Sequence, residues 1–425
     1  MLSDWIHWLS SKRPDELLLL MLPWLLLDTP RYGLGSIAVC FGDAFKSALP
    51  RNLRNDNKRY HRPLVCAILA GLNEAETVGA TLESVLNSYP NLEVIVVDDG
   101  STDGMSNVAR QIAIAHENVI VLRKPHRGGK SSALNFALPF TKAEIIVCVD
   151  TDSHLEPTAI WEIVQPFTDP AVGAVAGTVL ARNGNVNLVT SLQCSEYLHS
   201  IFVGRMIASH LGILSIVSGA FGAFRREALE RAQGWDVGPG EDGDLVLRLR
   251  KAGWKVVHAP YAQCLTNLPT SWGQLFRQRR RWEWATITLD CRKHIDMANV
   301  FSPNFRLANF AVLAETWLFS IALTIAYFGY LLWLCVADTE ALIFVLLTSY
   351  AAYMVLELLK WIVVLYFSPN RRRDICTAWC APLLPAYYFY LKCATLVAIL
   401  EETFYRRSSD DGFVPERVRR VTWRW

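Results

Sequence analysis

The middle of the chain alternates between short apolar runs, rich in β-branched residues, and longer segments of helical character. The apolar runs read LVCAILA at residues 64–70, LEVIVVDD at 92–99, NVIVLRK at 118–124, AEIIVCVD at 143–150 and AVGAVAGTV at 171–179. Continuous apolar runs of this kind are typical of parallel strands that helices cover on both faces. The pattern predicts an α/β domain with a mostly parallel sheet within residues 63–300.

The start of the chain contains two apolar segments. Residues 17–27 read LLLLMLPWLLL and would form a helix about 16 Å long, which is short of the roughly 30 Å hydrocarbon core of a bilayer. A second apolar segment follows at 34–41, so residues 1–50 form either a broken spanning helix or an interfacial pair. No small-residue cleavage site follows the leucine run, and we expect no cleavable signal peptide. Residues 51–62 are basic and predict a solvated cytoplasmic linker.

The longest apolar stretches lie toward the end of the chain. Residues 316–337 carry no charge and can cross a bilayer, and 341–367 form a second candidate span. Glu357 and Lys360 interrupt the second span three positions apart. They are either a neutralised pair or a polar face that lines a sugar channel. The basic run at 371–373 places the next turn on the cytoplasmic side.

Residues 375–400 are apolar but contain Lys392, and the tail at 405–425 is basic and aromatic. A full crossing would export the charges of the tail. We therefore expect 375–400 to be interfacial, re-entrant or a tight hairpin; a partner subunit or an additional crossing would change this. Residues 301–404 then form transmembrane and interfacial helices, and the tail stays in the cytosol. There it either covers a site on the soluble domain or anchors at the lipid interface through its tryptophans.

Composition agrees with a soluble middle domain between membrane segments, and we expect an integral protein of the inner or plasma membrane whose soluble domain lies in the cytoplasm. Hydrophobic residues make up 52% of the 425 residues, and this apolar excess gathers toward the two ends. The formal net charge is only +2, and no continuous basic face is visible, so we expect no nucleic acid partner. The ten cysteines form no CxxC pair and no cluster at zinc-ligand spacing, which favours buried free thiols.

Two carboxylates, Asp150 and Asp152, follow directly after the apolar run that ends at Val149. At this spacing they can bind one hard divalent cation, which in turn bridges the two phosphates of a nucleotide sugar. The alternative for a D-x-D sequence is a solvated loop. The strand directly before it and the polar residues at other strand ends favour the metal site.

Two further strand ends are polar and carry Asn73 with Glu74, and Asp98 with Asp99. Turn and cap chemistry would explain either pair by itself. Because the carboxyl ends of parallel strands meet at one edge of the sheet, we expect a crevice shared with the D-x-D carboxylates. In that crevice Asp99 can accept a hydrogen bond from a uracil N–H or a ribose hydroxyl.

The segment HRGGKSSALN, residues 126–135, lies between these strand ends in the sequence. Gly128 and Gly129 free the backbone, and Lys130 can reach a phosphate as a point charge. The glycine spacing is not that of a Walker A loop. The alternative is an exposed lysine at a helix start.

Glu241 and Asp242, in the sequence GEDGD, precede an amphipathic helix. The helix dipole stabilises acidic residues at an N-terminus, so capping alone would explain both. Glycosyl transfer by a single displacement also needs a carboxylate that accepts the proton of the attacking hydroxyl. We assign this role to Asp242.

The sequence QRRRW at residues 278–282 is the last candidate motif. As a structural feature it would be a basic flank beside the membrane. As a site, Arg281 can stabilise a diphosphate leaving group, Trp282 can stack on a sugar ring, and Gln278 can bind a hydroxyl. These three needs together explain a Gln, an Arg and a Trp at this spacing.

The order of the motifs NE, DDGS, GGK, DTD, SGA, ED and QRRRW resembles that of the processive inverting glycosyltransferases of family 2. This group contains the cellulose, hyaluronan, chitooligosaccharide and poly-N-acetylglucosamine synthases. The resemblance covers residues 64–284. Each motif is weak by itself, and together they are highly specific. One departure is GED at 240–242, where members often have TED.

The resemblance implies a GT-A fold, a UDP-sugar donor and Mg²⁺ or Mn²⁺ as cofactor. By motif match, Asp99 would hold the uridine, Asp150 and Asp152 the diphosphate and metal, and Asp242 would be the base. The QRRRW residues would bind the diphosphate and the terminal acceptor sugar. Ser218 and Gly219 match the acceptor-side motif of the poly-N-acetylglucosamine synthase type, which favours UDP-N-acetylglucosamine slightly over UDP-glucose.

The expected function is therefore that of a membrane-bound processive enzyme that builds a β-linked polysaccharide and secretes it. The expected partners are the UDP-sugar, the growing polysaccharide, membrane lipid and either a small membrane subunit or further copies of the chain. Two alternatives stay open. One is a non-processive transferase acting on a lipid-linked acceptor, and the other is an inactive subunit of an exopolysaccharide complex.

Overall fold

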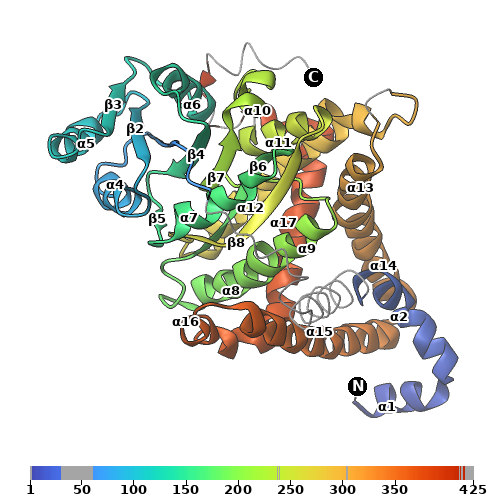
Figure 1. Cartoon of the computed structure of the whole chain (residues 1–425). Helices are drawn as coiled ribbons and strands as arrows, with labels where there is room; N and C mark the ends of the chain where they lie inside the picture. Colours follow the sequence, from blue (N-terminus) through green and yellow to red (C-terminus); the bar gives the residue numbers. More distant parts are fainter. Residues whose placement is uncertain are drawn as a thin grey trace, which may run out of the picture.

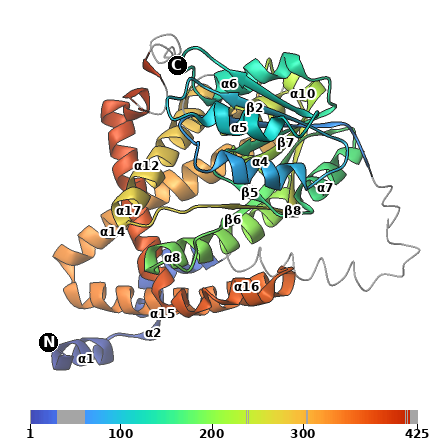
Figure 2. The same ribbon diagram turned by 90° about the vertical axis from the view of Figure 1, so that its left-hand side faces the viewer.

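The computed structural model describes residues 2–29, 61–236, 238, 240–302, 305–410, 412, 415 and 416. A sheet covered by helices forms the upper part of the molecule in Figures 1 and 2, and long helices form the lower part. The segment expected at 34–41 and most of the basic linker at 51–62 lie outside the described residues.

The described residues form one eight-stranded sheet in the order β3-β2-β1-β4-β7-β6-β8-β5. The strands are β1 (Val65–Gly71), β2 (Leu92–Asp98), β3 (Val119–Arg123), β4 (Ile145–Asp150), β5 (His154–Leu155), β6 (Val172–Ala181), β7 (Phe221–Arg225) and β8 (Lys255–Thr266). The five apolar runs of the sequence all become strands. Four of them, β1 to β4, pair in parallel, as predicted.

The sheet is nevertheless mixed, because β7 runs antiparallel to both β4 and β6. This strand reads FGAFR and is too short to stand out as an apolar run. It separates the parallel half β3-β2-β1-β4 from the parallel pair of β6 and β8. The expected α/β class is confirmed, with an antiparallel insertion that the sequence pattern did not reveal.

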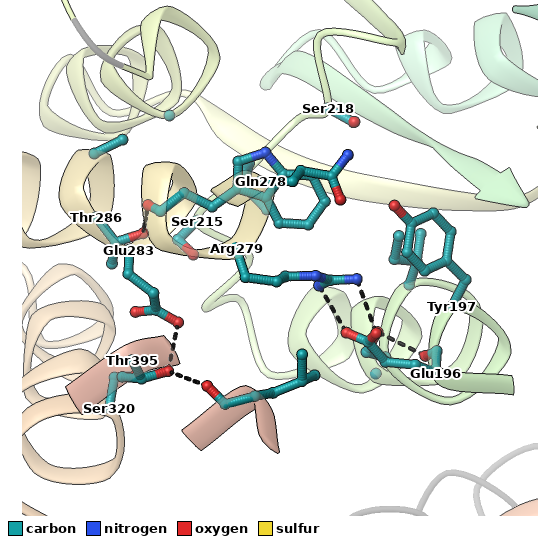
Figure 3. A pocket seen from close by; sticks show the side chains of 18 of the residues that line it. Glu196, Tyr197, Ser215, Ser218, Gln278, Arg279, Glu283, Thr286, Ser320 and Thr395 are labelled. Atoms are coloured by element: carbon teal, nitrogen blue, oxygen red, sulfur yellow. Dashed lines mark hydrogen bonds and ion pairs between the residues drawn. The ribbon is translucent and has the colours of Figure 1, made fainter. Parts of the chain in front are cut away.

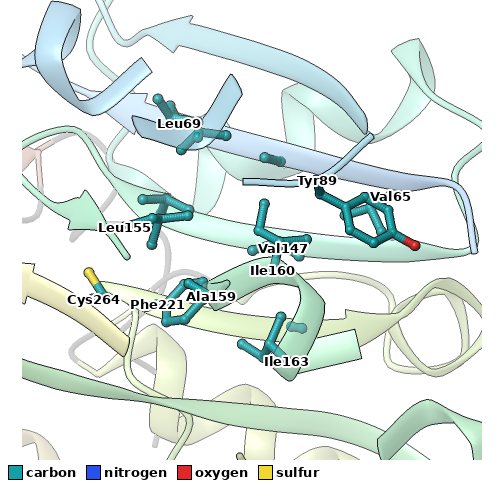
Figure 4. Close-up of a cluster of buried hydrophobic side chains, with 14 of the residues drawn as sticks. Val65, Leu69, Tyr89, Val147, Leu155, Ala159, Ile160, Ile163, Phe221 and Cys264 are labelled. Atoms are coloured by element: carbon teal, nitrogen blue, oxygen red, sulfur yellow. The ribbon is translucent and has the colours of Figure 1, made fainter. Parts of the chain in front are cut away.

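Helices cover both faces of the sheet and bury a separate core on each. On one face the core contains α4 (Val78–Leu86), α5 (Met105–Ala113) and α7 (Ala159–Val164). On the other face it contains α6 (Lys130–Ala137), α10 (Arg226–Arg231) and α11 (Glu241–Lys251). Successive residues of β1 alternate between the two cores, as the period of a strand requires. Figure 4 shows the first core, where Phe221 of β7 packs with Val147 of β4.

A second group of helices lies against the sheet and joins it to the lower part of the molecule. The π-helix η4 (Leu198–Gly204) continues α8 (Leu188–Tyr197) and leads into α9 (Arg205–His210). The helix α12 (Trp272–Thr288) carries the QRRRW sequence. A third core joins α8 and η4 to the helices below them, with Phe202 and Tyr387 among its fully buried side chains.

Three helical segments in the described part of the chain are long and apolar enough to cross a membrane, with 31, 29 and 28 residues. The first runs from Leu307 to Ala337 and combines α13 (Leu307–Glu315), η7 (Thr316–Ala322) and α14 (Leu323–Ala337). The second is α15 (Thr339–Phe367), and the third combines η8 (Ala378–Leu383) with α17 (Leu384–Tyr405). The short helix α16 (Arg371–Ile375) connects the last two.

The structure extends one segment expected in this region and excludes one of the alternatives for another. The first candidate span begins at Leu307, so it includes Asn309 and Glu315 in addition to the uncharged residues 316–337. Of the three alternatives expected for 375–400, the tight hairpin is wrong, because α17 runs without a turn from Leu384 to Tyr405. Lys392 is accommodated because its Nζ donates to the carbonyl of Phe319 at 3.2 Å and contacts Thr324 Oγ1 at 3.2 Å.

The N-terminal helices α1 (Leu2–Ser11) and α2 (Pro14–Thr29) lie against the turn between α14 and α15 (Figure 1). Trp8 Nε1 donates to Asp338 Oδ2 at 3.3 Å, and the Tyr330 hydroxyl donates to the carbonyl of Leu20 at 3.1 Å. The short apolar helix predicted from the leucine run is thus present. It packs on the candidate membrane helices.

Candidate active site

The carboxyl ends of β1, β2 and β4 lie next to one another. Gly71 pairs with Asp98, and Ala70 pairs with Asp150, so the loops that follow these strands open at the same edge of the sheet. A single cavity of about 2310 Å³ begins there. The candidate residues that line it are Glu74, Asp99, Lys130, Asp150, Asp152, Ser218, Gly219, Glu241, Asp242, Gln278, Arg281 and Trp282.

Two candidate residues, Asn73 and Asp98, are absent from this lining and support the loops beneath it. The Asn73 side-chain oxygen accepts from the Thr102 backbone N–H at 2.9 Å. Asp98 is buried and accepts from the backbone N–H of Ser101 at 2.6 Å. Burial alone would raise the pKa of Asp98, but its bonds from Ser101 lower it below its usual value. Both residues therefore shape the crevice from outside the cavity.

Asp99 fastens the glycine-rich loop to the sheet. Its Oδ2 accepts from the backbone N–H of Gly129 at 2.6 Å, and its Oδ1 accepts from the Gly128 N–H at 2.9 Å. Its Oδ1 also lies 2.5 Å from Lys124 Nζ. Gly129 has φ +85°, a conformation that favours glycine, and a Cβ there would lie 3.2 Å from Pro415 Cδ. Lys124 was not among the residues predicted from the sequence. Its position directly after the apolar run of β3 could have indicated that it lies at the same edge of the sheet.

Lys130 lies at the centre of the acidic residues. Its Nζ contacts Asp150 Oδ1, and a Cβ at Gly219 would lie 2.6 Å from the same Nζ and 3.6 Å from Glu241 Oε1. Burial by itself would lower the pKa of Lys130, but the charges of Asp150 and Glu241 raise it well above its usual value. The ammonium group thus balances carboxylates that would otherwise repel one another.

The same crowding acts on the carboxyl groups. Burial, followed by the charge of Asp150, raises the pKa of Asp152. Burial, followed by the charge of Asp242, raises the pKa of Glu241. Both shifts arise first from burial, which disfavours the negative form, and second from the neighbouring carboxylate. Within the described residues no group of three or more His, Cys, Asp or Glu side chains encloses a metal site. The two D-x-D carboxylates suit a hard cation that also takes oxygen ligands from a substrate.

Asp242 is held at the N-terminus of α11 by two backbone groups. Its Oδ2 accepts from the Gly219 N–H at 3.1 Å, and its Oδ1 accepts from the Gly243 N–H at 2.8 Å. Gly240 directly before this turn has φ +68°, and a Cβ there would lie 2.9 Å from Ala285 Cβ of α12. The departure from TED to GED therefore accompanies a close approach of α11 to α12.

Asp244 was not identified from the sequence, although it lies in the same motif. It is buried, and it contacts His294 Nε2 at 2.8 Å, Arg248 Nε at 2.8 Å and Lys293 Nζ at 2.7 Å. Burial alone would raise the pKa of Asp244, but the His294 hydrogen bond and the two cations hold it far below its usual value. These contacts fix the start of α11 against the segment that follows α12.

The residues of the QRRRW sequence divide between two environments. Gln278, Arg281 and Trp282 line the cavity, and Gln278 Oε1 is buried with no hydrogen-bond partner among the described residues. Arg279 and Arg280 form ion pairs with Glu196 and Glu401; Arg279 and Glu196 also line the cavity, whereas Arg280 and Glu401 are absent from its lining. Figure 3 shows Arg279 directed at the Glu196 carboxylate, with Gln278 on the side of the cavity that carries Ser218. A basic flank beside the membrane does not explain this division.

The cavity continues from α12 into the space between the long helices. Its lining there includes Tyr327 of α14, Tyr353 of α15 and Phe389 of α17. Glu357 contacts Lys360 Nζ and lies 3.0 Å from His199 Nδ1 of η4. Glu357 and Lys360 thus form the pair that was one of the two alternatives, and both also line the cavity, as the other alternative required.

Comparisons with known proteins agree with this architecture. A family model described as "Glycosyltransferase like family 2" matches residues 62–285. Curated relatives named poly-beta-1,6-N-acetyl-D-glucosamine synthase, from Staphylococcus epidermidis and Staphylococcus aureus (strain COL), are 31% and 29% identical over 218 residues. These matches cover 51% of this chain and 52% of each relative, so the chain spans about half the length of the curated relatives it matches.

A solved mannosyltransferase from Pyrobaculum calidifontis, in complex with GDP-Man and Mn²⁺, has the same fold with a TM-score of 0.61. Its sequence is 21% identical, and the alignment covers 91% of this chain and 99% of that chain. The likeness shows the GT-A-type fold and extends beyond the sheet into the membrane helices. Since the family model matches more than half of the residues, this chain belongs to glycosyltransferase-like family 2.

Proposed function

We propose that this protein is a membrane-bound, processive, inverting glycosyltransferase that polymerises a β-linked polysaccharide from a UDP-sugar. One observation supports the proposal most strongly. A single cavity collects the strand-end carboxylates, the start of α11 and one face of α12, and then continues between α14, α15 and α17. A polymerase would need these three parts in this order: a donor site, an acceptor site and an exit path for the growing chain.

The donor would bind at the carboxyl edge of the sheet. The uridine would lie over the loop that Asp99 fastens, near Glu74, and Lys130 would move from Asp150 toward a phosphate. Asp150 and Asp152 would hold Mg²⁺ or Mn²⁺, which supplies positive charge to the departing diphosphate. The two carboxylates line the same cavity two positions apart, which supports this assignment, because a hard divalent cation takes oxygen ligands.

Asp242 would accept the proton from the acceptor hydroxyl as that hydroxyl attacks the anomeric carbon of the donor. The two backbone N–H groups that bind its carboxylate fix its orientation before the substrate arrives. Arg281 would stabilise the leaving UDP from the other side of the cavity. A single displacement on an α-linked donor inverts the anomeric centre and yields a β linkage.

The acceptor end of the glycan would lie between Ser218 and Gly219 on one side and Trp282 on the other. Gln278 Oε1 supports this placement, since a buried acceptor without a partner suits a sugar hydroxyl. The relatives named poly-beta-1,6-N-acetyl-D-glucosamine synthase favour UDP-N-acetylglucosamine as donor over UDP-glucose. The catalytic domain would face the cytoplasm, where UDP-sugars are present, and the product would leave through the membrane helices.

The membrane half of the cavity also favours one other function. Its aromatic and aliphatic lining between α14, α15 and α17 would equally suit the tail of a lipid-linked acceptor that receives a single sugar. Processivity distinguishes the two, because a polymerase gives a ladder or smear of products and the single-transfer enzyme gives one extractable lipid product.

The test is UDP release by the purified full chain with UDP-N-acetylglucosamine, UDP-glucose, UDP-galactose and UDP-glucuronate, each with Mg²⁺ and with Mn²⁺. We expect metal-dependent UDP release with one donor and labelled product of high molecular mass on a gel. Labelled product confined to an organic extract would support the lipid acceptor. The absence of UDP release with all four donors would contradict the proposal.

A further inference from the structure

Arg279 occupies one of the two positions between Gln278 and Arg281, and it makes the best-defined ion pair of α12. Its two terminal nitrogens donate to the two carboxylate oxygens of Glu196, each at 2.8 Å. Only 13% of the Arg279 side chain and 9% of the Glu196 side chain are exposed. A bidentate pair of this kind fixes the plane of the guanidinium as well as its position.

The fixed guanidinium lies against the indole of Trp282. Its Cζ is 4.5 Å from the ring centroid of Trp282, and 5.8 Å from that of Tyr197. Arg279 and Trp282 are three positions apart on α12, so their side chains share one face of the helix. Trp282 itself is 39% exposed and lines the cavity. Arg279 therefore supports one side of an aromatic ring that remains available to a ligand.

Glu196 is itself held by a membrane helix. The hydroxyl of Tyr387, on α17, donates to Glu196 Oε2 at 2.5 Å, and Tyr387 is fully buried. The contacts thus run from α17 through Glu196 of α8 and Arg279 to Trp282. Tyr387, Glu196 and Arg279 are largely buried, so their positions are restricted, and the series ends at the partly exposed ring of Trp282.

We propose that Glu196 is a positioning residue for the acceptor, which acts through Arg279 to hold Trp282 in the orientation that stacks on the terminal sugar. The inference rests on the proposed function for the role of Trp282. With a neutral side chain at position 196, Arg279 loses its bidentate partner and no longer supports the indole. The terminal sugar then binds less firmly between additions, while the donor site at the other end of the crevice is unchanged.

The chain offers a matched control on the same helix. Arg280 NH1 donates to Glu401 Oε1 at 3.1 Å, and the Arg280 guanidinium lies 5.0 Å from the ring of Trp284. This pair has the same chemistry and also joins α12 to a neighbouring helix. Trp284, however, is absent from the residues that line the cavity. Glu401→Gln therefore removes a comparable ion pair without touching the acceptor platform.

The kinetic test compares the full-length wild type with Glu196→Gln and Glu401→Gln, using labelled UDP-N-acetylglucosamine and UDP-glucose. We expect Glu196→Gln to shorten the product and to raise the share of UDP released by hydrolysis about fivefold to tenfold. We expect the donor KM to stay within twofold. Glu401→Gln should leave product length and the hydrolysis share at wild-type values. Equal effects of both variants, or an effect of Glu196→Gln on donor KM alone, would overturn the inference.

A spectroscopic test does not depend on activity. In protein labelled with 5-fluorotryptophan, the ¹⁹F resonances lost in Trp282→Phe and Trp284→Phe identify the two indoles. Glu196→Gln should shift the resonance of Trp282 and leave that of Trp284 in place, and Glu401→Gln should do the reverse. An unmoved Trp282 resonance in Glu196→Gln would contradict the positioning role, even in a protein that shows no transfer. If the Trp282 resonance shifts in Glu196→Gln as expected but the wild-type protein releases no UDP, the result counts against the proposed function and not against the positioning role.

Discussion

The backbone N–H of Gly219 donates to Asp242 Oδ2 at 3.1 Å, which joins the loop before β7 to the first turn of α11. These residues are 23 positions apart in the chain. The contact connects the acceptor-side sequence SGA with the carboxylate that we propose as the base. The hydrogen bond orients the Asp242 carboxylate toward the crevice, and its donor is a backbone N–H, which is held in place by the chain.

Asp242→Asn should abolish transfer and preserve UDP binding. Asparagine has the same shape and can still accept from the Gly219 N–H, but it cannot take the proton of the attacking hydroxyl. We expect kcat to fall by about 10²- to 10⁴-fold. Turnover of the UDP-sugar gives the rate, and calorimetric titration gives the Kd of UDP. Simultaneous loss of transfer and of UDP binding would show that Asp242 has a different role.

Asp152→Asn should raise the concentration of Mn²⁺ or Mg²⁺ needed for half-maximal activity by tenfold or more. One of the two D-x-D carboxylates is then neutral, and the cation loses a charged oxygen ligand. Loss of the Mn²⁺ electron paramagnetic resonance signal of the free ion on binding, with UDP present, measures the same affinity without turnover. Asp169→Asn is the control, since Asp169 pairs with Lys255 at 2.9 Å outside the cavity. Equal metal affinity in both variants would exclude Asp152 as a ligand.

Trp282→Ala should shorten the product, whereas Trp284→Ala should not. The first substitution removes the exposed ring in the cavity, and the second removes a ring whose Nε1 donates to Glu401 Oε2 at 3.1 Å. Gel filtration of the labelled product measures chain length. Both variants lose a large aromatic side chain from α12, so a comparable loss of stability is expected for both. Shortening in both variants would indicate a general weakening of α12.

Gly240→Ala should lower stability and activity together. The residue has φ +68°, which costs an alanine roughly 1–2 kcal/mol, and the new Cβ would lie 2.9 Å from Ala285 Cβ. Relief of that contact moves the start of α11, and Asp242 with it, away from α12. Gly238→Ala is the control in the same loop, because no heavy atom of the described residues lies within 4 Å of its Cβ position. Thermal unfolding measures stability, and UDP release measures activity. Equal melting temperatures and equal activities of Gly240→Ala and Gly238→Ala would contradict the expected backbone strain at Gly240.

The ionisation of Asp290 should make the folded protein less stable as the pH rises. Burial, together with the charge of Glu315, raises the pKa of Asp290 to about 6 from the usual 3.8. The folded protein therefore keeps a proton that the unfolded chain releases. The contribution of this group is fully present below pH 3.8 and is lost as the pH rises through about 6.

Asp290→Asn removes this dependence, so its melting temperature should exceed that of the wild type increasingly between pH 4 and pH 7. Thr316 Oγ1 donates to Asp290 Oδ2 at 2.6 Å, and an asparagine oxygen can accept the same bond. Thermal unfolding in detergent across this range is the measurement. Asp296→Asn is the control, because the Asp296 side chain is 65% exposed. A constant difference between Asp290→Asn and wild type at every pH would show that the charge of Asp290 is not responsible.

The sequence by itself determined the parallel part of the sheet and the edge at which the polar residues gather. Apolar runs such as that of β4 need only local contacts and burial to become strands, and parallel strands align their carboxyl ends. Asp99 and Asp150 were therefore predictable as neighbours from the ends of their runs. The first two candidate membrane helices followed from apolar length alone, and the third did not.

Only the tertiary structure decided which polar residues reach the cavity. Asp98 and Asp99 are consecutive, yet one supports a loop and the other lines the cavity, because successive side chains at a strand end point to opposite sides. Arg279, Arg280 and Arg281 are chemically identical, but their positions around α12 differ. Arg279 pairs with Glu196 in the lining of the cavity, Arg280 pairs with Glu401 outside that lining, and Arg281 lines the cavity. Those partners lie on helices distant in the sequence. No local pattern encodes them, since they arise from how α8, α12 and α17 pack together.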